Sequence, residues 1–248
     1  MPISNYWRVA REPRYSLTFA LPLLAAYEVL AFLLSGQDLA GVRNGADVLL
    51  KQAFVAFGGR HGLILFGALL LGGGAWMVVR DWSTKRVEAW VFPVMLLESV
   101  LYALAFGLVT GALTSLLLPG LTLIAPATDL SIQAPLSWSL ATQLMISLGA
   151  GIYEELLFRV LLVSGLALFG RLVLAWSRTA SGIFAVVVGA LIFSGFHYIG
   201  PYGDSFQLTS FTFRAVAGVL FSGLYLLRGF GVTSWTHALY DLLLFVSG

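Results

Sequence analysis

Three short patterns in the second half of the chain combine carboxylates, an arginine and imidazoles at helical spacings. Their ionisable members are Glu154, Glu155, Arg159, His197, His237 and Asp241. Carboxylates and imidazoles both exchange protons with water, so these residue types suit general acid–base chemistry. The chain has no cysteine, and no serine stands in a recognisable nucleophile motif. Hydrolysis by an activated water is therefore favoured over a covalent route. The HExxH pattern of one class of zinc enzymes is absent.

The first pattern, Glu154-Glu155-Leu-Leu-Phe-Arg159, places one carboxylate where an arginine can neutralise it. Residues four apart share a helix face, and a glutamate that precedes the basic residue is the favourable order. Glu155 and Arg159 are therefore predicted to pair. Glu154 is rotated by about 100° around the helix and is left available for chemistry.

The other two patterns each have a structural interpretation when taken alone. His197 ends the segment Phe-Ser-Gly-Phe-His and is compatible with an interfacial residue that binds headgroups or a carbonyl. His237 and Asp241 share one helix face and are compatible with a self-satisfied pair that packs a helix bundle. Taken with the first pattern, they bring polar groups from three helices, which is how bundles build an interior site.

Composition places these residues in a membrane protein. The chain of 248 residues is 59% hydrophobic and only 10% charged, whereas a soluble chain carries about a quarter charged residues. These values exclude a disordered chain, a coiled coil and a nucleic-acid-binding surface. A charged group at membrane depth costs about 2.5–3.5 kcal/mol on insertion scales, so it faces the interior and has a partner. Glu28 and Glu98 are also at membrane depth, where they line a substrate path or, as we expect, pair with an interior donor.

The apolar segments predict an all-α, polytopic helical bundle with about seven to eight transmembrane helices and its site in the interior. The predicted spans are 15–34, 62–79, 90–118, 136–163, 181–197, 211–227 and 232–246, and 47–57 is a possible eighth, interfacial element. No linker separates two domains, so residues 1–248 are expected to form one integral-membrane domain. Lys and Arg gather in the N-terminal segment, at 80–86, at 171–178 and at Arg228, which predicts a cytoplasmic N-terminus.

In this order and in a membrane protein, the three motifs resemble the signature of the CPBP family of intramembrane proteases. This family, also called Abi, contains the CAAX proteases, the bacteriocin-processing proteins and the Ras-converting prenyl-protein endopeptidases. The resemblance rests on Glu154/Glu155/Arg159, on Phe193/His197 and on His237/Asp241, and it covers roughly residues 138–248. It implies a membrane endopeptidase, and we expect a multi-pass protein of a bacterial cell membrane.

The resemblance also implies a role for each residue. Glu154 and His197 would activate the attacking water, His237 and Asp241 would stabilise the oxyanion, and Glu155 and Arg159 would hold the site together. The prenyl-protein endopeptidases carry Asn where this chain has Asp241, and an ionised Asp cannot donate to an oxyanion. Asp241 must therefore be protonated, orient His237 or help hold a metal. The motifs leave a glutamic and a metal-dependent protease open. A zinc ion, if present, would be held by Glu154, His197, His237 and Asp241.

Two other functions use the same residue types. A transporter or channel places buried Glu and His on an ion or proton pathway, but it predicts corresponding broken helices in two halves of the chain, and the sequence shows no such repeat. A non-catalytic immunity or scaffold member of the same family is the second alternative, although the motif set is intact. The expected partners are a membrane-associated protein or peptide substrate and the lipid bilayer, with no nucleic acid.

Overall fold

The computed structural model describes residues 5–34, 43–82, 87–119, 139–200 and 203–247, and within these ranges the chain is helical and has no strand. The helices are α1 (Tyr6–Val9), α2 (Pro13–Leu34), α3 (Gly45–Gly58), α4 (Gly62–Gly67), α5 (Gly73–Trp82), α6 (Val91–Leu117), α7 (Leu140–Gly149), α8 (Ser164–Leu172), α9 (Arg178–Phe196), α10 (Leu208–Arg228) and α11 (Phe230–Ser247). A 3₁₀ turn, Gly59–His61, joins α3 to α4. Two π-helical stretches, η3 (Ala68–Gly72) and η5 (Ala150–Val163), continue α4 into α5 and α7 into α8.

The predicted polytopic helical fold is confirmed. Five helical stretches of the described residues are long and apolar enough to cross a membrane: Pro13–Leu34, Gly45–Trp82, Val91–Leu117, Arg178–Phe196 and Leu208–Arg228. The second of these turns a corner at Gly59, whose φ of 53° is left-handed and suits glycine. The predicted element at 47–57 is therefore a separate helix, α3, and the predicted span at 62–79 is formed by α4 and α5.

The two remaining predicted spans are also helices, and they carry the polar residues of the three motifs. The span predicted at 136–163 corresponds to α7, η5 and α8 and runs on to Leu172, and the span predicted at 232–246 corresponds to α11. Neither of them is among the five stretches above. The start of the former span, residues 136–138, lies outside the described residues.

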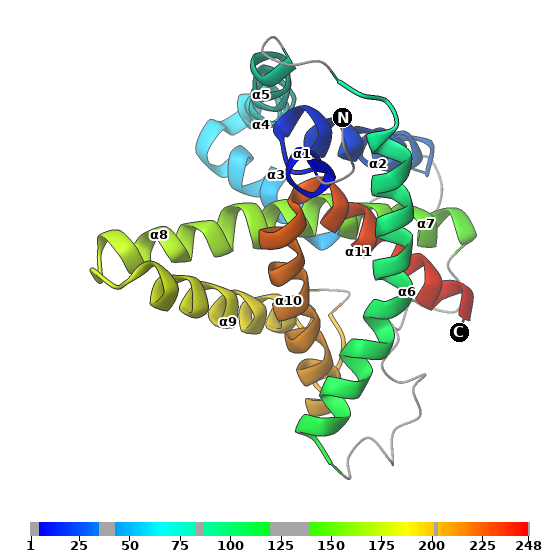
Figure 1. The fold of residues 1–248 in the computed structure, drawn as a ribbon. Helices are drawn as coiled ribbons and strands as arrows, with labels where there is room; N and C mark the ends of the chain where they lie inside the picture. Colours follow the sequence, from blue (N-terminus) through cyan, green and yellow to red (C-terminus); the bar gives the residue numbers. More distant parts are fainter. Residues whose placement is uncertain (1–4, 35–42, 83–86, 120–138, 201–202, 248) are drawn as a thin grey trace.

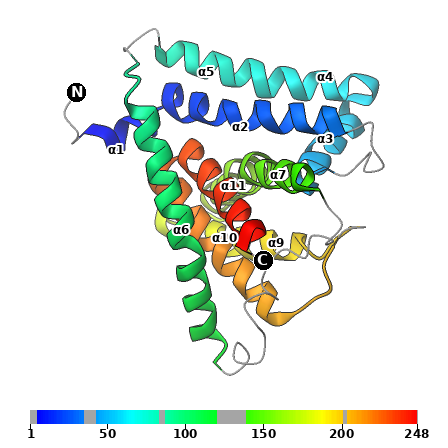
Figure 2. The ribbon, with the colours of Figure 1, turned by 90° about the vertical axis from the view of Figure 1, so that its right-hand side faces the viewer.

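The helices form three sets that cross one another. In Figure 1, α6 and α10 run up the view while α8 and α9 run across it, and the loop between α8 and α9 lies apart from the N-terminus. Figure 2 shows α2 lying along α4 and α5, and α2 packs against α5. α11 passes through the middle, where it contacts α2, α6, α7, α10 and η5. This central position brings residues of α11 close to residues from both halves of the chain.

Three helices that position the site or its neighbours begin at polar capping residues. The side chains of Asn44, Ser139 and Ser177 accept hydrogen bonds from first-turn N–H groups of α3, α7 and α9. Such caps satisfy donors that the helix itself leaves without a partner. The caps therefore define where these helices start, although the apolar content sets their length.

Candidate active site

The site lies where η5 meets α11, and a glycine permits the close approach of the two. A Cβ atom on Gly151 would lie 2.4 Å from the carbonyl oxygen of Ser234 and 2.8 Å from the Cβ of Ala238. Only a residue without a side chain fits this crossing. The contact places the carboxylates of η5 directly against the imidazole of α11. π-Helical stretches such as η5 occur often at functional sites.

Glu155 is fully buried and is shared by two partners. Its Oε1 lies 3.1 Å from an Nη atom of Arg159, as the spacing of four predicts, and both side chains are at most 1% exposed. The same oxygen also accepts a hydrogen bond of 2.7 Å from Nδ1 of His237. A carboxylate oxygen can only accept here, so Nδ1 carries the proton. Glu155 therefore fixes the ring orientation of His237.

The second ring nitrogen of His237 faces two more carboxylates. Nε2 lies 4.0 Å from Oε2 of Glu154 and 3.7 Å from Oδ2 of Asp241. The ring of Phe221 stacks on the imidazole with centroids 4.3 Å apart. Three carboxylates thus surround one imidazole, an arrangement that complements a positive charge on that ring.

His197 stands at the C-terminal end of α9 and is half-buried. Its Nδ1 lies 2.9 Å from the carbonyl oxygen of Phe193, and a carbonyl only accepts, so this nitrogen carries the proton. Nε2 of the neutral ring is then free to accept a proton. His197 lies close enough to Glu154 for the two to interact electrostatically. The six residues of the three motifs thus gather in one region.

Two residues near the site do not belong to the three motifs. Asn44, the capping residue of α3, donates from Nδ2 to Oε1 of Glu154 over 2.8 Å. Arg214 pairs with Asp204, whose backbone N–H donates to the carbonyl of His197 over 3.0 Å. In the sequence, Asn44 is recognisable only as a residue type that often caps a helix. Arg214 is recognisable only as a charged residue within an apolar segment. Neither signal points to the site.

Glu28 and Glu98 each pair with a basic side chain and accept a hydrogen bond from a tyrosine hydroxyl. Glu28 contacts Arg43 at 2.9 Å and Lys51 at 3.0 Å, and it accepts a hydrogen bond of 2.5 Å from the hydroxyl of Tyr153.

Glu98 contacts Arg228 at 2.5 Å and accepts a hydrogen bond from Tyr6. Burial, together with that hydrogen bond, raises the pKa of the Tyr6 hydroxyl, which therefore remains a donor at neutral pH. Both glutamates are thus bound in ion-pair networks that join distant helices.

The residues give limited support to a metal site. Among the described residues, no group of three or more His, Asp or Glu side chains lies where it could hold a metal ion together. Of the four residues that the resemblance suggests as ligands, His237 has Nδ1 bound to Glu155 and keeps Nε2, and Glu154 has one oxygen bound to Asn44 and keeps the other.

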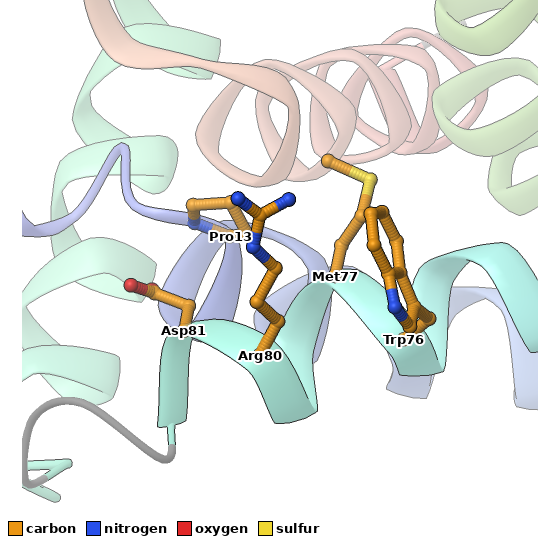
Figure 3. Close-up of a pocket in the computed structure, with 5 residues that line it drawn as sticks. All are labelled: Pro13, Trp76, Met77, Arg80 and Asp81. Atoms are coloured by element: carbon orange, nitrogen blue, oxygen red, sulfur yellow. The ribbon is translucent and has the colours of Figure 1, made fainter.

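A surface pocket of about 340 Å³ lies elsewhere, between the start of α2 and the end of α5. Its lining residues are Pro13, Trp76, Met77, Arg80 and Asp81 (Figure 3). None of the six motif residues lines it. The pocket is thus separate from the site.

Fold and site together define an all-helical integral membrane protein with a buried cluster of carboxylates and histidines. Residues 136–243 match the model of a family described as Type II CAAX prenyl endopeptidase Rce1-like. This part of the chain is similar to that family, which confirms the resemblance carried by the three motifs. The match supports, in general terms, an intramembrane endopeptidase of the CAAX type with a peptide or protein substrate in the membrane. Comparisons with curated proteins and with solved structures found no match.

Proposed function

We propose that the protein hydrolyses a peptide bond with a water molecule that Glu154 and His197 activate. The observation that carries this proposal is the contrast between the two adjacent glutamates. Glu155 is paired with Arg159, whereas Glu154 has a neutral amide as its hydrogen-bond partner and keeps a second oxygen near His237. Glu154 is therefore the carboxylate of the adjacent pair that is left without an arginine partner and can take a proton from water.

The proton moves between the water, the base and the leaving group. Water attacks the carbonyl carbon of the scissile bond and gives a proton to Glu154, with Nε2 of His197 as the second acceptor near that carboxylate. The attack produces a tetrahedral oxyanion. The same proton then passes to the amide nitrogen and the C–N bond breaks, which gives an amine and a carboxylic acid. The acid gives its remaining proton to the amine, and the products leave as a carboxylate and an ammonium group. No atom of the enzyme becomes covalently attached to the substrate.

His237 is proposed to stabilise the oxyanion. In its imidazolium form, Nε2 donates a hydrogen bond, while Nδ1 donates to Glu155. A donor that is already oriented before the charge develops contributes most in a dry site. Asp241, 3.7 Å from Nε2, is proposed to orient His237 and complement its charge rather than to donate itself.

The substrate is best found by comparing cells that contain the wild-type protein with cells that contain Glu154→Ala. Sequencing of protein termini in the membrane fraction is expected to show at least one new terminus in wild-type cells, and its uncleaved parent in the variant cells. Identical sets of termini in the two fractions would contradict the proposed proteolysis. Proteoliposome flux that depends on Glu154 would instead favour a transporter.

Chelation separates water activation by glutamate from activation by zinc. We expect the purified protein to keep its full rate of cleavage after treatment with 1,10-phenanthroline and with EDTA. Loss of activity that returns when Zn²⁺ is added would overturn this expectation and assign the metal chemistry to the same residues.

We also propose that the N-terminus is cytoplasmic. Arg14 contacts Asp81 at the end of α5, and Arg228 donates to the carbonyl of Trp7 over 2.8 Å. The N-terminal segment, the end of α5 and the end of α10, each of which carries arginine, therefore lie together. The chain has no cysteine, so single cysteines at Arg8 and Arg60 can be labelled without interference. A membrane-impermeant maleimide is expected to label position 8 only from the cytoplasmic side. Labelling of position 8 from outside intact cells would contradict the proposal.

A further inference from the structure

The carboxylate of Glu154 is held by a residue from the other half of the chain. Asn44 stands 110 positions earlier, outside the segment 136–243 that matches the family model. Its side chain is 4% exposed, and its Nδ2 donates to Oε1 of Glu154 over 2.8 Å. Because the other oxygen of Glu154 faces Nε2 of His237 at 4.0 Å, this bond determines which oxygen faces the imidazole.

The orientation of the Asn44 amide follows from its second hydrogen bond. Oδ1 accepts from the backbone N–H of Ala46 over 2.9 Å, as a capping residue does. A backbone N–H can only donate, so the oxygen of the amide must face α3 and the nitrogen must face Glu154. One side chain therefore caps a helix and holds a carboxylate at the same time.

The position of Asn44 is itself held by buried contacts. Its backbone N–H donates to the hydroxyl oxygen of Tyr27 over 3.3 Å, and that hydroxyl donates to Asp47 over 2.8 Å. A Cβ atom on Gly149 would lie 2.6 Å from the Tyr27 ring and 2.7 Å from Cβ of Asn44. The end of α7 therefore lies directly against Asn44, which brings Glu154 within reach.

A second bond connects the neighbouring residue of η5 to the same region. The hydroxyl of Tyr153 donates to Glu28, which also binds Arg43 and Lys51 on either side of the first turn of α3. Tyr153 and Glu154, which are adjacent in η5, are thus each hydrogen-bonded to a residue of the N-terminal half. The two bonds restrict rotation of the segment that carries Glu154.

We propose that Asn44 is a positioning residue for Glu154: its neutral amide orients the carboxylate without neutralising it. An arginine in this place would pair with the carboxylate and weaken it as a base. An apolar residue would leave the carboxylate free to rotate. The inference rests on the proposed role of Glu154 as the base, and it extends the catalytic apparatus beyond the segment that the family model covers.

Asn44→Ser tests the proposal because it separates the two functions of the side chain. Serine is as good a capping residue as asparagine, so the start of α3 is expected to remain folded. Its hydroxyl is too short to reach Glu154. We expect kcat to fall about 10- to 100-fold, the effect of losing one hydrogen bond to a charged group, while KM stays unchanged. Asn44→Asp also keeps the cap and the volume, and it is expected to lose more activity because it places a second carboxylate beside Glu154.

Ser177→Ala is the matched control, since it removes the capping side chain of α9 outside the site. We expect it to lower thermal stability slightly and to leave kcat unchanged. Wild-type kcat in Asn44→Ser, with Glu154→Gln inactive, would overturn the positioning role and leave the proposed function intact. An active Glu154→Gln would instead overturn the proposed function itself. If Asn44→Ser does not fold, Asn44→Asp decides, because a fully active aspartate variant also contradicts the proposal.

Discussion

Glu154→Gln is expected to lower kcat/KM by on the order of 10²–10⁴-fold and to leave the fold unchanged. Glutamine has the shape of glutamate, and its amide oxygen still accepts the hydrogen bond from Asn44. It cannot take a proton from water, so only the acid–base step is removed. Cleavage of a membrane-associated peptide by purified protein in lipid nanodiscs measures the change, and a thermal melt measures the fold.

Glu88→Gln is the matched control for that variant. Glu88 precedes α6, outside the site, and accepts a hydrogen bond from the indole of Trp90, which glutamine can also accept. We expect Glu88→Gln to cleave at the wild-type rate. Full activity in Glu154→Gln would eliminate Glu154 as the base, whatever the other variants show.

Arg159→Leu is expected to lower the free energy of unfolding by about 3–5 kcal/mol. Arg159 is 1% exposed and Glu155 is fully buried, so the substitution leaves a carboxylate without its cation in a region of low dielectric constant. The rings of Phe193 and Phe221, 4.3 and 5.3 Å from the guanidinium carbon, lose a cation–π partner as well. Denaturant titration in mild detergent, together with the yield of monodisperse protein, measures the loss.

A second substitution shows whether the uncompensated charge causes that loss. Arg159→Leu combined with Glu155→Leu removes the charge, so we expect part of the stability to return. We expect this double variant to be inactive, because Glu155→Leu removes the oxygen that accepts the hydrogen bond from Nδ1 of His237. Arg171→Leu, at an exposed arginine of α8, is expected to change stability by no more than about 0.5 kcal/mol. Wild-type stability in Arg159→Leu would contradict the pairing argument.

Local spacing predicted the contacts that depend on one helix alone. Glu155 and Arg159 pair, and His237 lies near Asp241, because residues four apart on any helix lie on the same face. The apolar content predicted the helices as well, since a segment in lipid must satisfy its backbone hydrogen bonds internally. These properties follow from sequence because they do not depend on how the helices pack.

Contacts between helices were not predictable in the same way. The sequence placed Glu155 with Arg159 but gave no sign that His237 would bind the same oxygen. It likewise gave no sign that the amide of Asn44 reaches Glu154. The spacing of residues along one helix does not indicate which face of another helix they contact, or where along that helix the contact lies.

The sequence by itself therefore determined that the protein is a helical membrane protein, and it determined which few ionisable residues are candidates for chemistry. A charged side chain in lipid is costly in free energy, so such a residue usually belongs to a functional site or to an ion pair. The tertiary structure decided which carboxylate is shared by Arg159 and His237 and which has the amide of Asn44 as its hydrogen-bond partner. The physical reason is that side-chain chemistry and helical period are local. The crossing of η5 with α11 at Gly151, and the contact of α7 with α3 at Gly149, depend on packing across the whole chain.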